Sequence, residues 1–278
     1  MRPVIFDLHS HSTFSDGILS PEQLVSRAKA NNVDVLALTD HDTVEGIAPA
    51  MRQAHREGLT CIAGVEFSSQ WGGRGIHIVG LGIDPKSAHI VDATAAQAVV
   101  RQERAGQIAD KLRHAGLGDV LESAREIAGA GSIGRVHIAR VLVKQGVVNS
   151  IDQAFNRYLG NGKPGDVKFR WPEFAEVINW VNHAGGVAVL AHPTKYNMTR
   201  TKLCAMVRDF AELGGAGLEV QSGRQSQQTT VDLVKIANKY QLCGSCGSDF
   251  HTPGQPWQEL GCVGELAAGV RPIWQHWN

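Results

Sequence analysis

Short apolar runs that end in polar residues recur along the first third of the chain. Four of them occur before residue 85, at 4–8, 33–39, 60–66 and 76–83. Apolar runs of this length, bounded by polar or turn-forming residues, are typical of strands buried on both faces of a sheet. Helical patterns follow the first two runs, one opening with Ser20 as N-cap and Pro21 in the first turn, and the other covering 43–57 and stopping at Gly58. This alternation predicts parallel strands joined by helical crossovers.

The pattern changes between about residues 86 and 165, where almost every segment has helical periodicity. Helices are predicted at 95–112, 121–128, 136–145 and 151–158. Strand–helix units then resume, with strands at 187–191, 218–220 and 242–248 and helices at 172–184, 201–213 and 225–240. About seven strands, most of them followed by a helix, favour a closed or nearly closed α/β barrel. We therefore predict one barrel domain from residues 1–85 and 166–278, capped by a helical insertion of residues 86–165.

Composition limits the classes of function. The chain has 278 residues, with 27 Lys and Arg against 27 Asp and Glu, so its formal net charge is zero. A protein that coats nucleic acid usually has a basic excess, so neutrality argues against that class while allowing a local basic patch. The start lacks a signal-peptide core, no apolar run is long enough to span a membrane, and the five cysteines are sparse. We expect a cytoplasmic protein that needs neither a membrane nor an obligate protein partner.

Polar residues next to the predicted strands carry the candidate chemistry. Among 12 histidines, two pairs of candidate ligands are spaced i and i+2, His9 with His11 and Asp249 with His251. Residues two apart in a strand point to the same side, so each pair can bind one ion. Because barrel strands bring their carboxyl ends to one mouth, the two pairs should meet there. Glu66 follows an apolar run, where a carboxylate is costly unless it binds a cation, and it is the natural bridge between two ions.

Four further candidate ligands lie at the start or end of a predicted strand or of a β–α connection. They are Asp16, His41, His77 and His192. A set of nitrogen and oxygen ligands without a thiolate suits Mn²⁺, Fe²⁺ or Zn²⁺ better than Ca²⁺ or Mg²⁺. Asp7 and Asp40 lie beside the ligands, and the sequence leaves open whether they orient imidazoles or cap loops.

In their order along the chain, these motifs resemble those of a known family. His-x-His, Ser-Asp-Gly, Thr-Asp-His-Asp, Gly-x-Glu, Ala-His-Pro and Gly-Ser-Asp-x-His span positions 9–251 and look like the PHP (polymerase and histidinol phosphatase) family. That family is similar to the amidohydrolases, and the resemblance implies a distorted (β/α)7 barrel with two or three metal ions. It implies one ion on His9, His11, Glu66 and Asp249, a second on Glu66, His77 and His192, and a third on Asp16, His41 and His251.

Three basic residues are candidate phosphate contacts. Arg135 falls in the first turn of a predicted helix after Gly134, where backbone N–H groups favour anions and a guanidinium adds a planar pair of donors. Lys163 lies in the Gly-rich loop 161–165, and Arg224 follows a predicted strand at the barrel mouth. Three separated cations that converge on a metal cluster would suit a substrate with more than one phosphate. Each residue also fits an ordinary surface position, which the sequence leaves open.

The long insertion, the segment Gly-Arg-x-His-Ile-Ala-Arg and Gly-Lys-Pro resemble one subgroup of the family, the nucleoside 3′,5′-bisphosphate phosphatases. The resemblance implies removal of the 3′-phosphate from adenosine 3′,5′-bisphosphate to leave AMP, with Arg135, Lys163 and Arg224 as phosphate contacts. A 5′-to-3′ exoribonuclease acting on short 5′-phosphorylated RNA at the same site is one alternative. Neutral net charge disfavours the long basic groove that it would use. Histidinol phosphate phosphatase and a non-enzymatic PHP module are two further alternatives.

The predicted reaction is attack on phosphorus by a hydroxide that bridges two metal ions, held chiefly through Glu66. His192 or His251, if not fully committed to a metal ion, is expected to protonate the departing ribose oxygen. The metal is expected to be Mn²⁺, with Fe²⁺ or Zn²⁺ as alternatives. The expected substrate is a small nucleotide.

Overall fold

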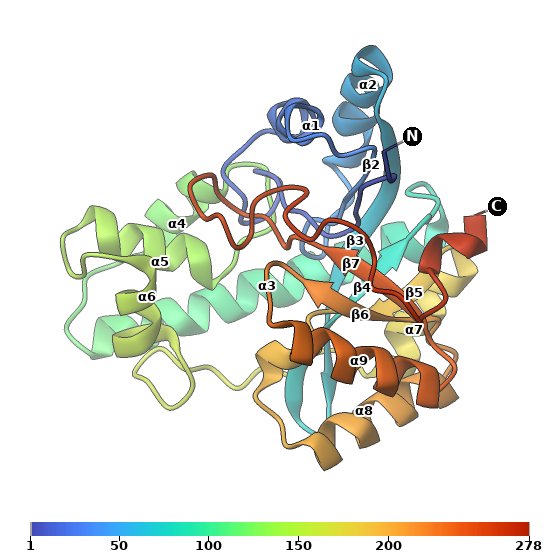
Figure 1. Cartoon of the computed structure of the whole chain (residues 1–278). Coiled ribbons are helices and arrows are strands. Elements are labelled where there is room, and N and C mark those ends of the chain that lie inside the picture. The colour runs from blue at the N-terminus through green and yellow to red at the C-terminus, as the bar shows by residue number, and fades with distance from the viewer. Residues whose placement is uncertain (1, 278) are drawn as a thin grey trace.

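The barrel is a single seven-stranded sheet in the computed structural model, which describes residues 2–277 (Figure 1). The strands follow chain order around it: β1 (Phe6–Asp7), β2 (Val35–Leu38), β3 (Thr60–Trp71), β4 (Arg74–Leu81), β5 (Val187–Leu190), β6 (Gly217–Ser222) and β7 (Cys243–Gly247). The segments around β1 and β7 pair with each other: the N–H of Leu8 donates to Cys246 O (3.0 Å), and that of His11 donates to Phe250 O (2.9 Å). The predicted α/β barrel of about seven strands is confirmed.

β4 departs from the predicted arrangement, because it runs antiparallel to both β3 and β5. The expectation that helical crossovers make all strands parallel is wrong here. Only Gly72 and Gly73 separate β3 from β4, and their φ angles are 55° and 73°. A two-residue turn of this kind joins antiparallel strands and has no room for the crossover that a parallel strand requires. β3 also runs beyond its predicted end, so Glu66 lies within a strand that pairs with β4.

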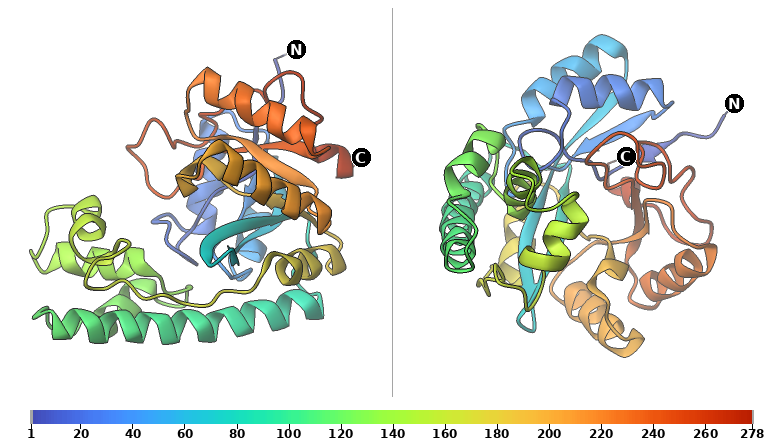
Figure 2. Two further views of the ribbon diagram at one scale, coloured as in Figure 1. Left: turned by 90° about the horizontal axis from the view of Figure 1, so that it is seen from below. Right: turned by 90° about the vertical axis from the view of Figure 1, so that its left-hand side faces the viewer.

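Helices cover the outside of the barrel and build the insertion (Figures 1 and 2). The barrel carries α1 (Pro21–Ala30), α2 (Ile47–Glu57), α7 (Phe174–His183), α8 (Arg200–Glu212), α9 (Gln227–Lys239) and the 3-10 turns η2 (Pro193–Tyr196) and η3 (Ile273–Trp277). The insertion consists of α3 (Ala88–His114), α4 (Leu121–Ala128), α5 (Arg135–Lys144), α6 (Ile151–Ala154) and the π-helical turn η1 (Phe155–Leu159). Within residues 2–277, no helix is both long enough and apolar enough to cross a membrane.

α3 belongs to both parts of the molecule. Its first half packs Ile90 and Ala93 into the barrel core, whereas its second half packs Ile108 and Leu112 into a separate core with α4 and α5. Figure 2 shows α3 as one long helix that runs beneath both parts. Because the insertion buries its own set of apolar side chains, we propose that residues 86–165 form a capping domain, with residues 1–85 and 166–278 as the barrel domain.

Candidate metal centre

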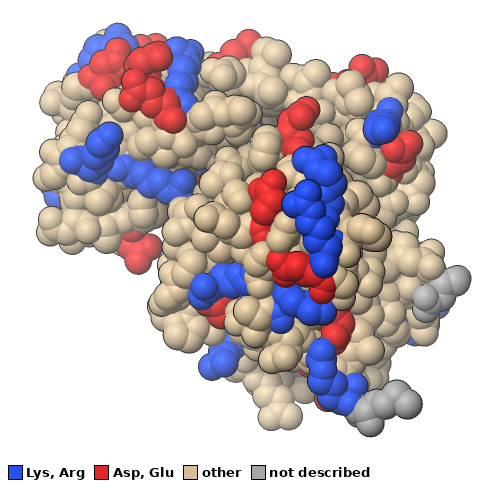
Figure 3. Space-filling view, turned by 90° about the horizontal axis from the view of Figure 1, so that it is seen from above, with Lys and Arg blue, Asp and Glu red and all other residues tan. Residues whose placement is uncertain are grey.

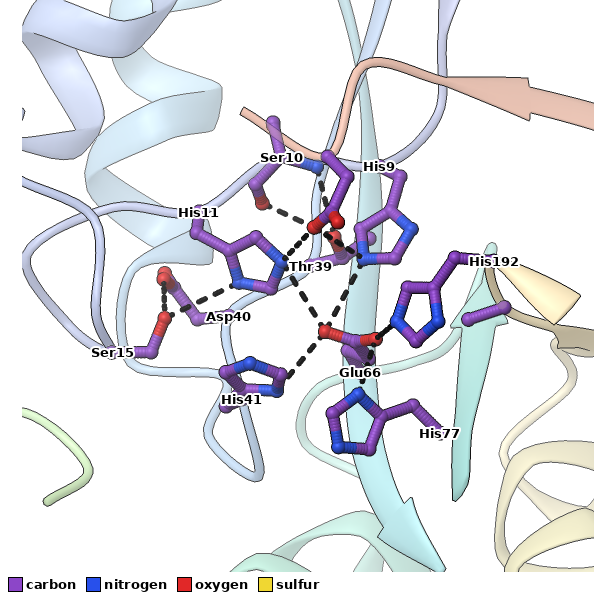
Figure 4. A network of polar contacts seen from close by, with 12 residues as sticks. His9, Ser10, His11, Ser15, Thr39, Asp40, His41, Glu66, His77 and His192 are labelled. Carbon is purple, nitrogen blue, oxygen red and sulfur yellow. Dashed lines mark hydrogen bonds and ion pairs between the residues drawn. The ribbon is translucent and has the colours of Figure 1, made fainter. Parts of the chain in front are cut away.

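Nine polar side chains converge at one mouth of the barrel, and Figure 4 shows the imidazoles arranged around Glu66. The nine are the predicted ligands His9, His11, Asp16, His41, Glu66, His77, His192, Asp249 and His251. Six are buried, and His41, His77 and His251 are partly buried. They come from segments far apart in the sequence, and they meet because the parallel strands end, and the antiparallel β4 begins, at the same mouth.

Glu66 lies at the centre of the group and is fully buried. Its Oε2 atom lies 3.0–3.2 Å from ring nitrogens of His41, His9 and His11. Its Oε1 atom lies 2.9 Å from Nδ1 of His77 and 2.9 Å from Nε2 of His192. Each oxygen therefore faces a different set of imidazoles, which is the arrangement that a carboxylate bridging two ions requires.

Several buried atoms of this cluster have no hydrogen-bond partner among the described residues, although other polar atoms lie close to them. They are Nε2 of His9 and of His11, Nδ1 of His41 and of His192, Oε2 of Glu66 and Oδ1 of Asp16. Buried polar side-chain atoms are normally hydrogen-bonded. Nitrogen and carboxylate lone pairs that face a common point are satisfied by a cation between them, so this donor set fits divalent metal ions.

The candidate ligand atoms fall into three overlapping groups, within each of which all atoms lie within 4.8 Å of one another. One group is the set predicted for the first ion, His9, His11, Glu66 and Asp249. The second joins His41 to Glu66 and His77, and the third adds His11 to Asp16, His41 and His251. Sequence reasoning thus did not anticipate that His11 and His41 would each belong to two groups. His192 approaches the second group through its contact with Glu66 Oε1.

Burial and neighbouring charges shift the pKa values of the candidate ligands in different directions. Burial lowers the pKa of His41 to about 4. Burial also disfavours the charged form of His11, but Asp249 and Glu66 outweigh it and raise the pKa of His11 to about 10. Burial raises the pKa of Glu66, yet His41, His9 and His77 together outweigh burial and hold that pKa well below its usual range. Because metal ligands must be deprotonated, a bound divalent ion would take the place of the proton on His11.

Asp7 and Asp40 both fix loops, and Asp40 also reaches an imidazole through Ser15, whose hydroxyl donates to Oδ1 of Asp40 (2.6 Å) and lies 3.4 Å from Nδ1 of His11. Oδ1 of Asp40 accepts the backbone N–H of Ser12 (2.7 Å) and Oδ2 accepts its hydroxyl (2.6 Å), which fixes the loop after His11. The two carboxylate oxygens of Asp7 accept the N–H groups of Ser248 and Gly261, each at 2.8 Å. Asp7 therefore ties β1 to the chain that follows β7.

Glu219, in the middle of β6, supports two ligands and was missed by the sequence reasoning. Its side chain is buried, its Oε1 lies 3.0 Å from Nδ1 of His9, and its Oε2 accepts the backbone N–H of His192. Partners of this kind fix the ring orientation of a metal-binding histidine. The signal that identified Glu66, a carboxylate inside an apolar run, is also present at Gly-Leu-Glu-Val.

Two of the ligands have backbone conformations that favour glycine. φ is 26° at His192 and 55° at Asp249. Such conformations cost roughly 1–3 kcal/mol and persist where the surroundings fix them. Glu219 holds the N–H of His192, and the carbonyl of His9 accepts the N–H of Asp249 (2.9 Å). The strain thus lies where strand ends must turn their side chains toward the cluster.

A cavity of about 770 Å³ lies between the cluster and the insertion, and Asp16, His41 and His77 form part of its wall. Its basic residues are Arg74, Arg101, Arg104, Arg135, Lys168 and Lys195, and its aromatic residues are Phe155, Phe169, Trp171 and Tyr196. Of the three predicted phosphate contacts, the structure places Arg135 in this wall. Lys163 and Arg224 are not among the described residues that line the cavity, and both are exposed. Arg101, Arg104 and Lys195 were not anticipated from the sequence.

Fold and site together define a class: an α/β barrel whose strand ends present a cluster of histidines and carboxylates able to hold more than one metal ion, as in metal-dependent hydrolases. The PHP domain family matches residues 7–159. The chain belongs to this family.

Several characterised relatives are similar over nearly the whole chain. A 5′-3′ exoribonuclease of Haemophilus influenzae is 44% identical, over 97% of this chain and 98% of its own length. A 3′,5′-nucleoside bisphosphate phosphatase of Chromobacterium violaceum is 40% identical, over 97% of this chain and 95% of its own length. A solved structure of an amidohydrolase from Chromobacterium violaceum with bound sulfate matches with a TM-score of 0.92 and 39% identity, covering 98% of this chain and 95% of that one.

Proposed function

We propose that this protein is a metal-dependent phosphatase that removes the 3′-phosphate of nucleoside 3′,5′-bisphosphates. One observation carries the proposal: a single cavity has three members of the candidate metal cluster, Asp16, His41 and His77, in one part of its wall and a group of arginines in another. A substrate with two phosphates can place one at each. The similarity to the bisphosphate phosphatase of Chromobacterium violaceum supports the same substrate class.

The arginine group has the properties of an anion site. Nε of Arg104 is buried and has no hydrogen-bond partner among the described residues. Burial, followed by the charges of Arg135 and Arg101, lowers the pKa of Arg104 to about 9. Desolvated like charges are unfavourable unless an anion joins them, and guanidinium groups match phosphate oxygens with pairs of donors. We therefore assign the phosphate that is not hydrolysed to Arg104 and Arg135. Lys163 and Arg224 remain proposed phosphate contacts, although neither lines this cavity.

The cluster positions the phosphate that is hydrolysed. Metal ions held by the nine ligands, when bound, would lower the pKa of water and neutralise charge on the phosphoryl oxygens. Glu66 orients five imidazoles at once, and Glu219 fixes His9 and His192. We propose that His192 or His251, whichever is not committed to a metal ion, protonates the departing ribose oxygen. The side chain of His251 is 27% exposed, whereas His192 is buried, so solvent reaches His251 more readily.

The candidate ligands support a choice of metal ion, and the cysteines support a cellular location. Nitrogen and oxygen donors without thiolate support Mn²⁺ as the ion, in two or three copies, with Fe²⁺ or Zn²⁺ as alternatives. All five cysteines are free thiols, which supports the proposed cytoplasmic location.

The proposed function is tested by comparing three substrates on the Mn²⁺-loaded protein. We expect kcat/KM to be highest for adenosine 3′,5′-bisphosphate, lower for a short 5′-phosphorylated RNA and lowest for histidinol phosphate. Phosphate release and chromatography of the nucleoside product provide the measurement. Fastest turnover of histidinol phosphate would overturn the substrate assignment and leave the metal centre intact.

A second candidate function is 5′-to-3′ exonucleolytic cleavage of short RNA, which the 44% identical relative of Haemophilus influenzae supports. The same cavity would bind the 5′-phosphate at the arginines and the first phosphodiester at the cluster. On the face drawn in Figure 3, basic side chains are interspersed with acidic ones rather than joined in a continuous basic track. That face therefore offers no continuous track for a long strand, because long strands are bound largely through their phosphates.

Arg104→Met is expected to raise KM for adenosine 3′,5′-bisphosphate with little change in kcat. Loss of a charge-assisted contact to phosphate costs about 1.5–3 kcal/mol, which is about 10–100-fold in binding. The steady-state constants of the variant, together with those for a nucleoside 3′-monophosphate, measure the effect. The monophosphate lacks the contact, so its KM should be nearly the same in both proteins. Arg125→Met, at an exposed position of α4, is the matched control, and an equal KM increase for both substrates would contradict the assignment.

A further inference from the structure

Lys195 links a metal ligand to the cavity, and the mechanism above does not use it. Its Nζ forms an ion pair with Oδ2 of Asp249. The side chain of Asp249 is 4% exposed, whereas that of Lys195 is 47% exposed and lines the cavity. The ammonium therefore lies where the metal cluster meets the space that a substrate would fill.

Short-range contacts fix the backbone that carries this lysine. Lys195 belongs to the turn η2, directly after His192, and its N–H donates to the carbonyl of His192 (2.9 Å). The next residue, Tyr196, is buried, and its hydroxyl donates to Ala191 O (3.0 Å) and accepts the N–H of His77 (2.9 Å). A turn held to two strands in this way places the lysine within reach of Asp249 without a flexible loop.

The two oxygens of Asp249 have different partners. Oδ1 lies 3.3 Å from Nε2 of His11 and 3.6 Å from Nε2 of His9, in the group of ligands proposed for the first ion. Oδ2 pairs with Nζ of Lys195, and it also lies 3.5 Å from Nε2 of Gln258. The lysine thereby leaves only Oδ1 to face the imidazoles, so that Asp249 would offer one oxygen to an ion.

An ammonium has three donors, and Asp249 occupies one. Lys195 lines the same cavity as His77 and Tyr196, so the other two are available to a ligand bound there. Positive charge fixed beside a phosphoryl group stabilises the charge that its oxygens carry during transfer, and this contribution is largest in a site shielded from water.

We propose that Lys195 is a catalytic residue that holds Oδ2 of Asp249 and donates a hydrogen bond to the phosphoryl group under attack. This inference rests on the proposed function and adds a residue to its reacting end. The ammonium gives up no proton. Water supplies the oxygen of the new P–O bond, the bond between phosphorus and the ribose oxygen breaks, and the ribose oxygen takes its proton from the histidine proposed above.

The test compares Lys195→Met and Lys195→Arg with Lys202→Met, an exposed lysine on α8 outside the cavity wall. Three quantities are measured on each protein: bound Mn²⁺ by mass spectrometry, the Kd of inorganic phosphate at saturating Mn²⁺ by calorimetry, and kcat and KM for adenosine 3′,5′-bisphosphate. For Lys195→Met we expect about a 10²-fold lower kcat. The Kd of phosphate should rise at least about tenfold, as loss of a charge-assisted hydrogen bond predicts.

Lys195→Arg should recover most of the phosphate affinity, because it keeps the charge, and Lys202→Met should match the wild type. The proposal is overturned if Lys195→Met, saturated with Mn²⁺, binds phosphate within about twofold of the wild type, whether or not it loses metal. It is equally overturned if kcat is unchanged. Failure of the proposed function is distinguishable, because a wild-type protein that does not hydrolyse adenosine 3′,5′-bisphosphate still reports the contact through the phosphate Kd.

Discussion

Glu66→Gln is expected to abolish turnover and metal retention together. Glu66 contacts five imidazoles from the fully buried centre of the cluster. A neutral amide cannot neutralise two ions, and its NH₂ group would face lone pairs of the same histidines. Metal-ion stabilisation of the transition state amounts to several kcal/mol, so we expect kcat to fall at least about 10³-fold. Mn²⁺ per chain and kcat at saturating substrate provide the measurement.

Two further Glu→Gln changes make this result specific. Glu212→Gln lies at an exposed position on α8, where the side chain is 69% exposed, and should leave metal content and kcat unchanged. Glu219→Gln removes the charge that orients His9 and should weaken metal binding by about 10–100-fold, a smaller effect than loss of a direct ligand. Chelator-treated wild type should behave like Glu66→Gln. A purified Glu66→Gln protein with normal activity would contradict the proposed role of Glu66 at the metal centre.

Arg101→Met is expected to lower the free energy of unfolding by about 3–5 kcal/mol, the usual effect of removing one partner of a buried ion pair. Arg101 is on α3, and its Nε donates to Oδ2 of Asp42 (2.6 Å). Asp42 is buried and follows His41 directly, so this pair joins the insertion helix to the metal centre. Gln97 and the N–H of Ser68 also donate to Asp42, but neither replaces the lost charge. Urea unfolding of the metal-free proteins, followed by tryptophan fluorescence, measures the change.

The matched control is Arg104→Met, one helical turn further along α3. Arg104 has no carboxylate partner among the described residues and contacts the Trp171 ring (5.4 Å), so its loss should cost less than about 1 kcal/mol. Asp42→Asn and the double variant Asp42→Asn/Arg101→Met complete a double-mutant cycle. A coupling energy near zero between Asp42 and Arg101 would contradict a stabilising role for this buried ion pair.

The sequence identifies most of the candidate metal centre because the chemistry of each candidate ligand is local. A histidine pair at i and i+2, or a carboxylate in an apolar run, is unusual enough to be recognised at His9, Glu66 or Asp249. The grouping of these ligands depends on how strand ends face one another. Neither the double participation of His11 and His41 nor the role of Glu219 can be derived from spacing along the chain.

The substrate side is less predictable for a different reason. Arg101 and Arg104 lie in a charged helical segment, Arg-Gln-Glu-Arg, whose pattern is the same as that of a solvated surface helix. Only the fold shows that this part of α3 faces the cavity. Lys163 was selected because it lies in a Gly-rich loop and Arg224 because it follows a predicted strand, and neither signal determines the direction in which the side chain projects. The antiparallel β4 likewise depends on the two glycines before it, a turn signal that the regular strand–helix alternation obscured.

The pairing that closes the barrel between β1 and β7 suggests a structural role for the proposed ions. β1 has two residues, so few backbone hydrogen bonds hold this seam of the barrel. His9 and His11 follow β1, Asp249 follows β7, and all three belong to one group of ligands. An ion bound there would act as a clasp between the two ends of the chain, because parting the strands would also break metal–ligand bonds. The supply of metal would then govern the integrity of the barrel as well as its chemistry.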